Sequence, residues 1–129
     1  MAFGKETVLE ESDFILSETD TNGKIVSIND DFLRISEFTE GELIGYPHNI
    51  VRHEDMPHAA FKDLWETIQS GNIWHGFVKN LTKSGGFYWV YATVFPYTSC
   101  GGEKRYLSCR KRALPEEVEA VEKLYKTMT

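Results

Sequence analysis

The sequence has few of the features that mark disulfide-rich, membrane or secreted proteins. It holds only two cysteines, Cys100 and Cys109, and neither belongs to a C-x-x-C pair, so a disulfide framework or a zinc ribbon is excluded. No apolar run approaches the roughly 20 residues that cross a bilayer, and the opening residues carry no apolar secretory signal. From these absences we expect a soluble, cytoplasmic segment that makes no membrane contact.

Positive charge is also scarce. The chain has 14 Lys and Arg residues against 20 Asp and Glu residues, which gives a net charge of −6. Because a protein that follows nucleic-acid phosphates carries an excess of basic residues, we do not expect nucleic acid as a partner. The length of 129 residues and the hydrophobic content of 41% are typical of one globular domain. Aromatic residues make up 13%, enough either to fill a core or to line a pocket for a flat ligand.

The common catalytic and metal-binding motifs are missing as well. The sequence contains no G-x-S-x-G elbow and no glycine-rich phosphate loop. His48, His53 and His58 lie five residues apart, whereas two ligands on one helical face need a spacing of three or four. His53-Glu54 begins an H-E-x-x-H motif, but Pro57 occupies its fifth position. We therefore predict neither a metal site nor an enzyme.

Turn and capping signals divide the chain into strands and helices. Asn22-Gly23 lies between two apolar runs and predicts a hairpin, and Thr39 with Glu42 fits a capping box. Elements are predicted, in order, as strands 14–17 and 24–28, short helices from Asn29 or Asp30 and from Thr39, a loop or single turn over 46–56, a helix from Asp55 to Gly71, strands 74–81, 87–97 and 104–110, and a helix from Pro115.

This order of elements predicts an α+β fold with a five-stranded antiparallel sheet, short helices on one face and terminal helices. We expect residues 1–12 to form an N-terminal lead-in or cap helix, 13–112 the globular domain and 113–129 an exit helix. Apolar residues of the last segment repeat at steps of four and three, at Leu114, Val118, Val121, Tyr125 and Met128. This stripe either packs on the domain's own sheet or carries a signal to a partner.

A polar side chain falls among apolar ones on the predicted strand 74–81. Trp74, Gly76, Val78 and Asn80 alternate onto the same face of that strand. A buried amide needs hydrogen-bond partners, which a heterocyclic ligand or a neighbouring loop can supply. The residues alone leave these two alternatives open for Asn80.

Two phrases of the sequence resemble the PAS domains of bacterial aerotaxis and energy-taxis receptors. They are P-H-N-I-V-R-H-E-D-M-P at 47–57 and W-H-G-F-V-K-N at 74–80, supported by Tyr88-Trp89-Val90. The resemblance runs from about Ser17 to Arg112. It implies a PAS fold, noncovalent FAD, the sensing of cellular redox state and a report to the chemotaxis pathway. Another PAS protomer or a chemoreceptor signalling domain is the implied partner, reached through the terminal helices.

The same resemblance implies a set of site residues. Arg52, His53 and Asp55 match the family's Arg-His-x-Asp and are expected to hold the cofactor or its loop, although Glu54 stands where the family often has proline. Further cofactor-binding residues implied by it, or by their fit to a flat ring, are Asn29, Phe61, Trp65, Trp74 and Asn80.

Each of these side chains has a chemical use toward a flavin. Trp74 could stack on the ring, Phe61 or Trp65 could close the pocket, and Asn29 and Asn80 could bond the ring's polar edge. Arg52 suits a pyrophosphate because its fork offers paired donors. His53 is either a ligand contact or a hydrogen-bonded loop residue. Asp55 is expected to hold Arg52 or His53, or to cap the following helix.

Two alternatives stay open at this point. A haem-binding gas sensor would use His58 or His53 as axial ligand, and a ligand-free PAS module would only mediate dimerisation or docking. Blue-light flavin–cysteine chemistry is not expected, because residues 48–56 contain no cysteine and Cys100 and Cys109 come too late in the chain.

Overall fold

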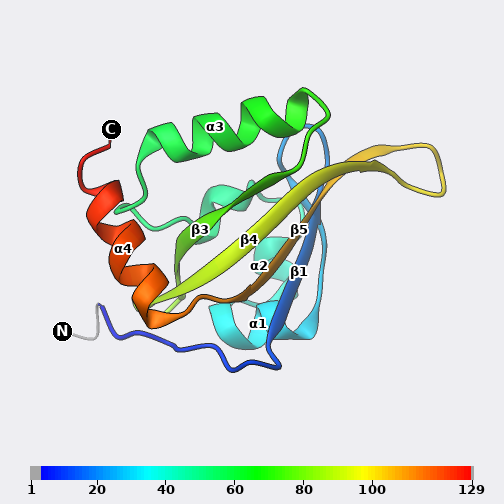
Figure 1. Ribbon diagram of the computed structural model, residues 1–129. Coiled ribbons are helices and arrows are strands. Elements are labelled where there is room, and N and C mark those ends of the chain that lie inside the picture. The colour runs from blue at the N-terminus through cyan, green and yellow to red at the C-terminus, as the bar shows by residue number, and fades with distance from the viewer. Residues whose placement is uncertain (1–3, 129) are drawn as a thin grey trace.

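The structure, a computed structural model, describes residues 4–128 and holds one antiparallel sheet of five strands (Figure 1). The elements are β1 (Phe14–Thr19), β2 (Ile25–Ile28), α1 (Asp30–Ser36), α2 (Glu40–Leu43), η1 (His48–Val51), α3 (His58–Gln69), β3 (Trp74–Leu81), β4 (Phe87–Thr98), β5 (Lys104–Arg112) and α4 (Pro115–Tyr125). The strand order in the sheet is β2-β1-β5-β4-β3, so the first strand of the chain, β1, pairs with the last, β5. The predicted α+β fold is confirmed.

Local side-chain chemistry fixes the early turns and helix starts as predicted. Gly23 adopts a φ of +83° in the β1–β2 hairpin. Asn29 is the N-cap of α1 and accepts a hydrogen bond from the Phe32 amide. The Thr39–Glu42 capping box opens α2, with both reciprocal bonds present.

The start of α3 was predicted too early. The helix begins at His58, and its N-cap is Pro57, whose ψ of 142° is extended. Asp55 does not cap it, because its carboxylate pairs with Lys79 on β3 at 2.6 Å and its amide donates to His53 Nδ1. Residues 52–56 therefore run along the edge of β3, where the His53 amide bonds the Lys79 carbonyl.

The core lies between the inner face of the sheet and the helices α1, α2, η1 and α3. Ile15 and Val90 of the sheet are fully buried there, together with Phe32 of α1 and Leu43 of α2. Strand alternation puts Val78 and Asn80 of β3 on this inner face, and Phe77 and Lys79 on the outer one.

Helix α4 packs on the outer face of its own sheet. The Tyr125 ring stacks on Trp89 of β4 at 6.3 Å, and its hydroxyl donates to the Phe77 carbonyl at 2.6 Å. Val118 and Val121 of the predicted stripe are half-buried. The stripe thus packs on the domain's own sheet through Tyr125, and its role in carrying a signal to a partner stays a prediction.

The N-terminal segment lies against the start of β4, and residues 4–13 form no helix, so the lead-in is irregular. The Phe87 amide bonds the Lys5 carbonyl, and the Thr7 amide bonds the Phe87 carbonyl. The remainder of the predicted lead-in, residues 1–3, and the last residue of the exit helix, 129, lie outside the described residues. Within 4–128, no helix is both long and apolar enough to cross a membrane.

Candidate functional site

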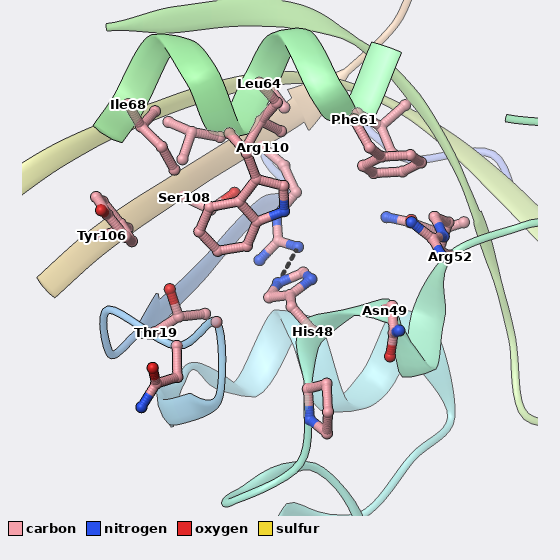
Figure 2. Close-up of a pocket in the computed structure, with 18 residues that line it drawn as sticks. Thr19, His48, Asn49, Arg52, Phe61, Leu64, Ile68, Tyr106, Ser108 and Arg110 are labelled. Carbon is pink, nitrogen blue, oxygen red and sulfur yellow. Dashed lines mark hydrogen bonds between the residues drawn. The ribbon is translucent and has the colours of Figure 1, made fainter. Parts of the chain in front are cut away.

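A cavity of about 350 Å³ opens between α3 and the inner face of the sheet (Figure 2). This volume is within the range of small-molecule and cofactor sites. The pocket is lined by Thr19, Asn22, Gly23, Pro47, His48, Asn49, Arg52, Phe61, Leu64, Trp65, Ile68, Val78, Asn80, Ala92, Val94, Tyr106, Ser108 and Arg110.

One face of α3 supplies the apolar wall of the pocket. Phe61, Leu64, Trp65 and Ile68 follow the helical i, i+3, i+4, i+7 spacing, so all four point toward the sheet. Trp65 meets the Tyr106 ring edge-on at 5.7 Å. A flat ring would find aromatic and aliphatic contacts along this wall.

Trp65 of the apolar wall packs against the β1–β2 hairpin. Gly23 lies so close to the Trp65 indole that an added Cβ would be 3.0 Å from the ring. The glycine is thus needed twice, for its positive φ and for the room it leaves to Trp65.

Arg110 forms the polar floor of the pocket. Its side chain comes from the central strand β5 and is only 2% exposed. Nη2 donates to Ser17 Oγ at 2.5 Å, Nη1 lies 3.1 Å from His48 Nε2, and the guanidinium lies over the Phe32 ring at 4.7 Å. The Arg110 Nε has no hydrogen-bond partner among the described residues.

Burial decides which of these floor groups is charged. Desolvation, assisted by the neighbouring Arg110 charge, lowers the pKa of His48 to about 3. Desolvation also lowers the pKa of Arg110, to about 10, which leaves the guanidinium protonated at neutral pH. Because arginine only donates, His48 Nε2 must accept, and the ring proton belongs on Nδ1.

Arg52 marks the border of the pocket. Its guanidinium lies 4.6 Å from the Phe61 ring centroid, and its backbone forms an isolated bridge with Asn80. A second hollow begins on the other side of it, lined by Asn49, Arg52, His53, Glu54, Met56, His58 and Leu81. Asn49 and Arg52 line both spaces.

Four of the eight predicted site residues meet in the main pocket. They are Arg52, Phe61, Trp65 and Asn80, drawn from the η1–α3 loop, α3 and β3. His53 lies instead in the second hollow, where its Nδ1 accepts from the Asp55 amide. Asp55 lines neither space, and its pair with Lys79 lowers the pKa of its carboxyl group.

Asn29 and Trp74 also lie outside both hollows. The Asn29 side chain is engaged at the start of α1, where Oδ1 accepts from the Phe32 and Leu16 amides and Nδ2 donates to the Phe14 carbonyl. The Trp74 indole lies over Gly76 and donates to Asp63 of α3 at 2.9 Å. Both side chains therefore position the elements that frame the pocket.

Arg110 and His48 line the pocket, although neither is among the residues predicted from the sequence. Arg110 belongs to a predicted strand, and alternation alone puts it on one face with Tyr106 and Ser108. That pattern could have identified the face, but which face of β5 is buried follows only from its pairing with β1. No group of three or more His, Cys, Asp or Glu residues suited to a metal ion occurs in 4–128.

Comparison with known proteins places this architecture in a family. The family model described as PAS fold matches residues 5–113. The chain belongs to the PAS family. The resemblance to aerotaxis receptors is also confirmed, because the PAS domain is 45% identical over 124 residues to the aerotaxis receptor of Escherichia coli (strain K12), covering 96% of this chain and 24% of that protein.

More distant relatives include the nitrogen fixation regulatory protein of Klebsiella oxytoca and the biofilm dispersion protein BdlA of Pseudomonas aeruginosa. The nitrogen fixation protein is 22% identical, and the match covers 95% of this chain and 25% of that protein. The biofilm dispersion protein is 29% identical, and the match covers 81% of this chain and 24% of that protein. The PAS domain thus spans about a quarter of the curated relatives it matches.

Solved structures with the same fold include light-oxygen-voltage domains. One, from a study of a flavin analogue, has a TM-score of 0.71 at 16% identity and covers 88% of this chain and 86% of that one. The light-state Aureochrome1 domain has a TM-score of 0.69 at 15% identity, covering 91% and 90%. These likenesses establish the fold alone.

Proposed function

We propose that this PAS domain binds FAD noncovalently and reports the redox state of the flavin to a chemotaxis partner. The observation that carries the proposal is the composition of the pocket: an aromatic wall, a buried amide and two arginines, with no Asp or Glu among the lining residues. Such a site suits a flat ring with a polar edge and a phosphorylated tail. The relation to an aerotaxis receptor supports the same proposal.

The residues present fit a flavin in kind and in position. Phe61 and Trp65 offer ring faces, and Asn80, which is 3% exposed, offers an amide that both donates and accepts. When bound, the flavin would supply reversible electron transfer. The protein's own part is to orient the ring, keep water from it and respond to a change in its hydrogen-bonding edge.

The second hollow favours a dinucleotide over a mononucleotide. Arg52 lines both spaces, so one side chain can hold phosphates while the tail continues past His53 and His58. FMN lacks the adenosine part of FAD, so it would leave this second space unfilled. We therefore expect FAD to bind more tightly than FMN, and both more tightly than riboflavin.

A route for the signal leads from the pocket to the outer face of the sheet. The loop that carries Arg52 also carries Asp55, which pairs with Lys79 on that outer face. The Lys79 ammonium in turn lies over Phe87 at 4.5 Å and over Trp89 at 6.0 Å. Trp89 stacks on Tyr125, so a shift of the loop reaches α4, through which a PAS protomer or receptor domain would receive it.

The haem alternative finds less support in this geometry. His53 and His58, its two candidate axial ligands, do not line the main pocket, and His48 Nε2 already accepts from Arg110. In a ligand-free module, the chain's own aromatic side chains should fill the pocket. Here a cavity of about 350 Å³ lies beside Phe61, Trp65 and Tyr106, which argues against this alternative. We propose a sensory role in the cytoplasm without enzymatic activity.

An absorption spectrum of the purified protein, before and after dithionite, tests the proposal. We expect structured blue absorption that bleaches on reduction and an extracted ligand that chromatographs as FAD. An intense Soret band would establish the haem alternative. A colourless protein that also fails to bind added FAD would establish the ligand-free one.

A further inference from the structure

Arg110 is a buried cation that has no counter-ion within the described part of the chain. Within residues 4–128 it forms no ion pair with a carboxylate, and its hydrogen-bond partners are a serine hydroxyl and a histidine ring. Its Nε is buried and has no hydrogen-bond partner among residues 4–128. An uncompensated buried charge is among the most costly features a fold can contain, so its position beside a cavity calls for a functional reason.

The neighbours of Arg110 hold the guanidinium in place without neutralising it. Ser17, 1% exposed, and His48 each accept hydrogen bonds, and Phe32 offers its ring face. His48 stays neutral, so it adds no charge of its own. The guanidinium is thus oriented toward the pocket, as Figure 2 shows, with its full positive charge available to whatever lies there.

The two arginines of the pocket differ in their surroundings. Arg52 is exposed, so water and salt screen its charge, whereas Arg110 is buried beneath the cavity and is screened far less. In a chain of net charge −6, the pocket nevertheless contains these two cations and no acid. Its field therefore favours the ligand state that carries more negative charge.

We propose that Arg110 binds the polar edge of the ring and makes the pocket prefer the reduced, anionic flavin over the oxidised, neutral one. Arg110 is then the residue that raises the reduction potential of the bound cofactor. The inference rests on the proposed function. Electrons balance when an external donor, dithionite in the test below, supplies two electrons and the solvent one proton, which leaves the ring with the single negative charge that Arg110 pairs.

Riboflavin is the appropriate probe, because it lacks phosphates and so bypasses their contact with Arg52. The reduction potential of riboflavin bound to the protein should be more positive than that of free riboflavin. Arg110→Gln should reduce the preference for the reduced ring at least tenfold, which is about 30 mV for a two-electron couple. Arg110→Lys keeps the charge and should retain more than half of the shift. Arg52→Gln removes a charge that solvent screens, so it should weaken FAD binding and lower the riboflavin potential by less than half of the shift that Arg110→Gln causes.

The outcomes separate this inference from the proposed function. Wild-type potential in a folded Arg110→Gln variant that binds riboflavin would overturn the role of Arg110 and leave flavin binding intact. A wild-type protein that binds no flavin would overturn both. Where Arg110→Gln fails to fold or to bind, the wild-type protein decides: a bound potential equal to or below that of free riboflavin contradicts the inference.

Discussion

The Arg110 guanidinium lies 3.1 Å from His48 Nε2, and the two side chains cannot both be charged at that distance. Arginine holds its proton more strongly, so His48 is the neutral member and acts as the acceptor. This relationship fixes one histidine tautomer and one positive charge at the floor of the PAS pocket. It also makes the stability of the fold sensitive to pH.

The first prediction concerns that sensitivity. The pKa of His48 falls from 6.5 in the unfolded chain to about 3 in the fold, so below pH 6.5 the unfolded chain binds the extra proton and the fold does not. The contribution of His48 is therefore intact above pH 6.5 and is lost as the pH falls toward 3. We expect the free energy of unfolding to drop by about 1 kcal/mol between pH 7.5 and 5.5.

Urea unfolding at the two pH values measures this drop. His48→Gln serves as the matched variant, because its side-chain oxygen still accepts from Arg110 and does not titrate. The variant should lose about 1 kcal/mol less than the wild type over the same interval. An identical drop in both proteins would show that His48 is not the group responsible.

The second prediction concerns Gly76 on the inner face of β3. A Cβ at this position would lie 2.4 Å from the Trp74 ring, which is buried and held by Asp63. Gly76→Ala must displace the indole and should cost about 1–3 kcal/mol of stability. Gly101→Ala is the control, since its Cβ would meet nothing closer than 3.7 Å. Equal unfolding midpoints for the two variants would refute the close contact.

The third prediction separates two tryptophans. Trp65 lines the pocket, whereas Trp74 is bonded to Asp63 and lies outside it. Trp65→Phe should remove most of the tryptophan quenching caused by FAD and weaken binding about 3- to 10-fold. Trp74→Phe should keep the quenching and lower stability by about 1 kcal/mol. The reverse pattern would place the ring against Trp74.

The fourth prediction concerns the seat of α4. The Tyr125 hydroxyl donates to the Phe77 carbonyl, and Tyr125→Phe removes this bond while it preserves the stacking on Trp89. We expect a loss of about 1 kcal/mol in the docking of the helix. Amide exchange should then accelerate in α4 and stay unchanged in β4 and β5. Unchanged exchange in α4 would mean that other contacts hold the helix.

Local signals in the sequence were sufficient for most of the fold. The cap at Asn29, the box at Thr39 and the glycine turns act within a few residues, so they can be recognised without knowledge of the rest of the chain. The start of α3 was not predicted correctly, because the Asp55 carboxylate binds Lys79, which is 24 residues away in the chain. Such a long-range pair overrides the local preference for a helix start.

The candidate site was only partly accessible from sequence for the same reason. Arg52 and Asn80 belong to phrases that carry the resemblance, and the structure brings them together through the bridge between the loop and β3. Arg110 looks like one basic residue in a basic run at the end of a strand. Arg110 is buried because β5 pairs between β1 and β4, and this long-range pairing cannot be predicted from a local sequence pattern.

A crystal structure of the protein purified together with its bound ligand is the decisive test of flavin binding in this pocket. We expect a three-ring flavin in the 350 Å³ cavity, against Phe61 and Trp65 and within hydrogen-bond reach of Asn80, with its phosphates at Arg52. A cavity closed by the protein's own side chains, or a flavin bound elsewhere on the surface, would contradict it.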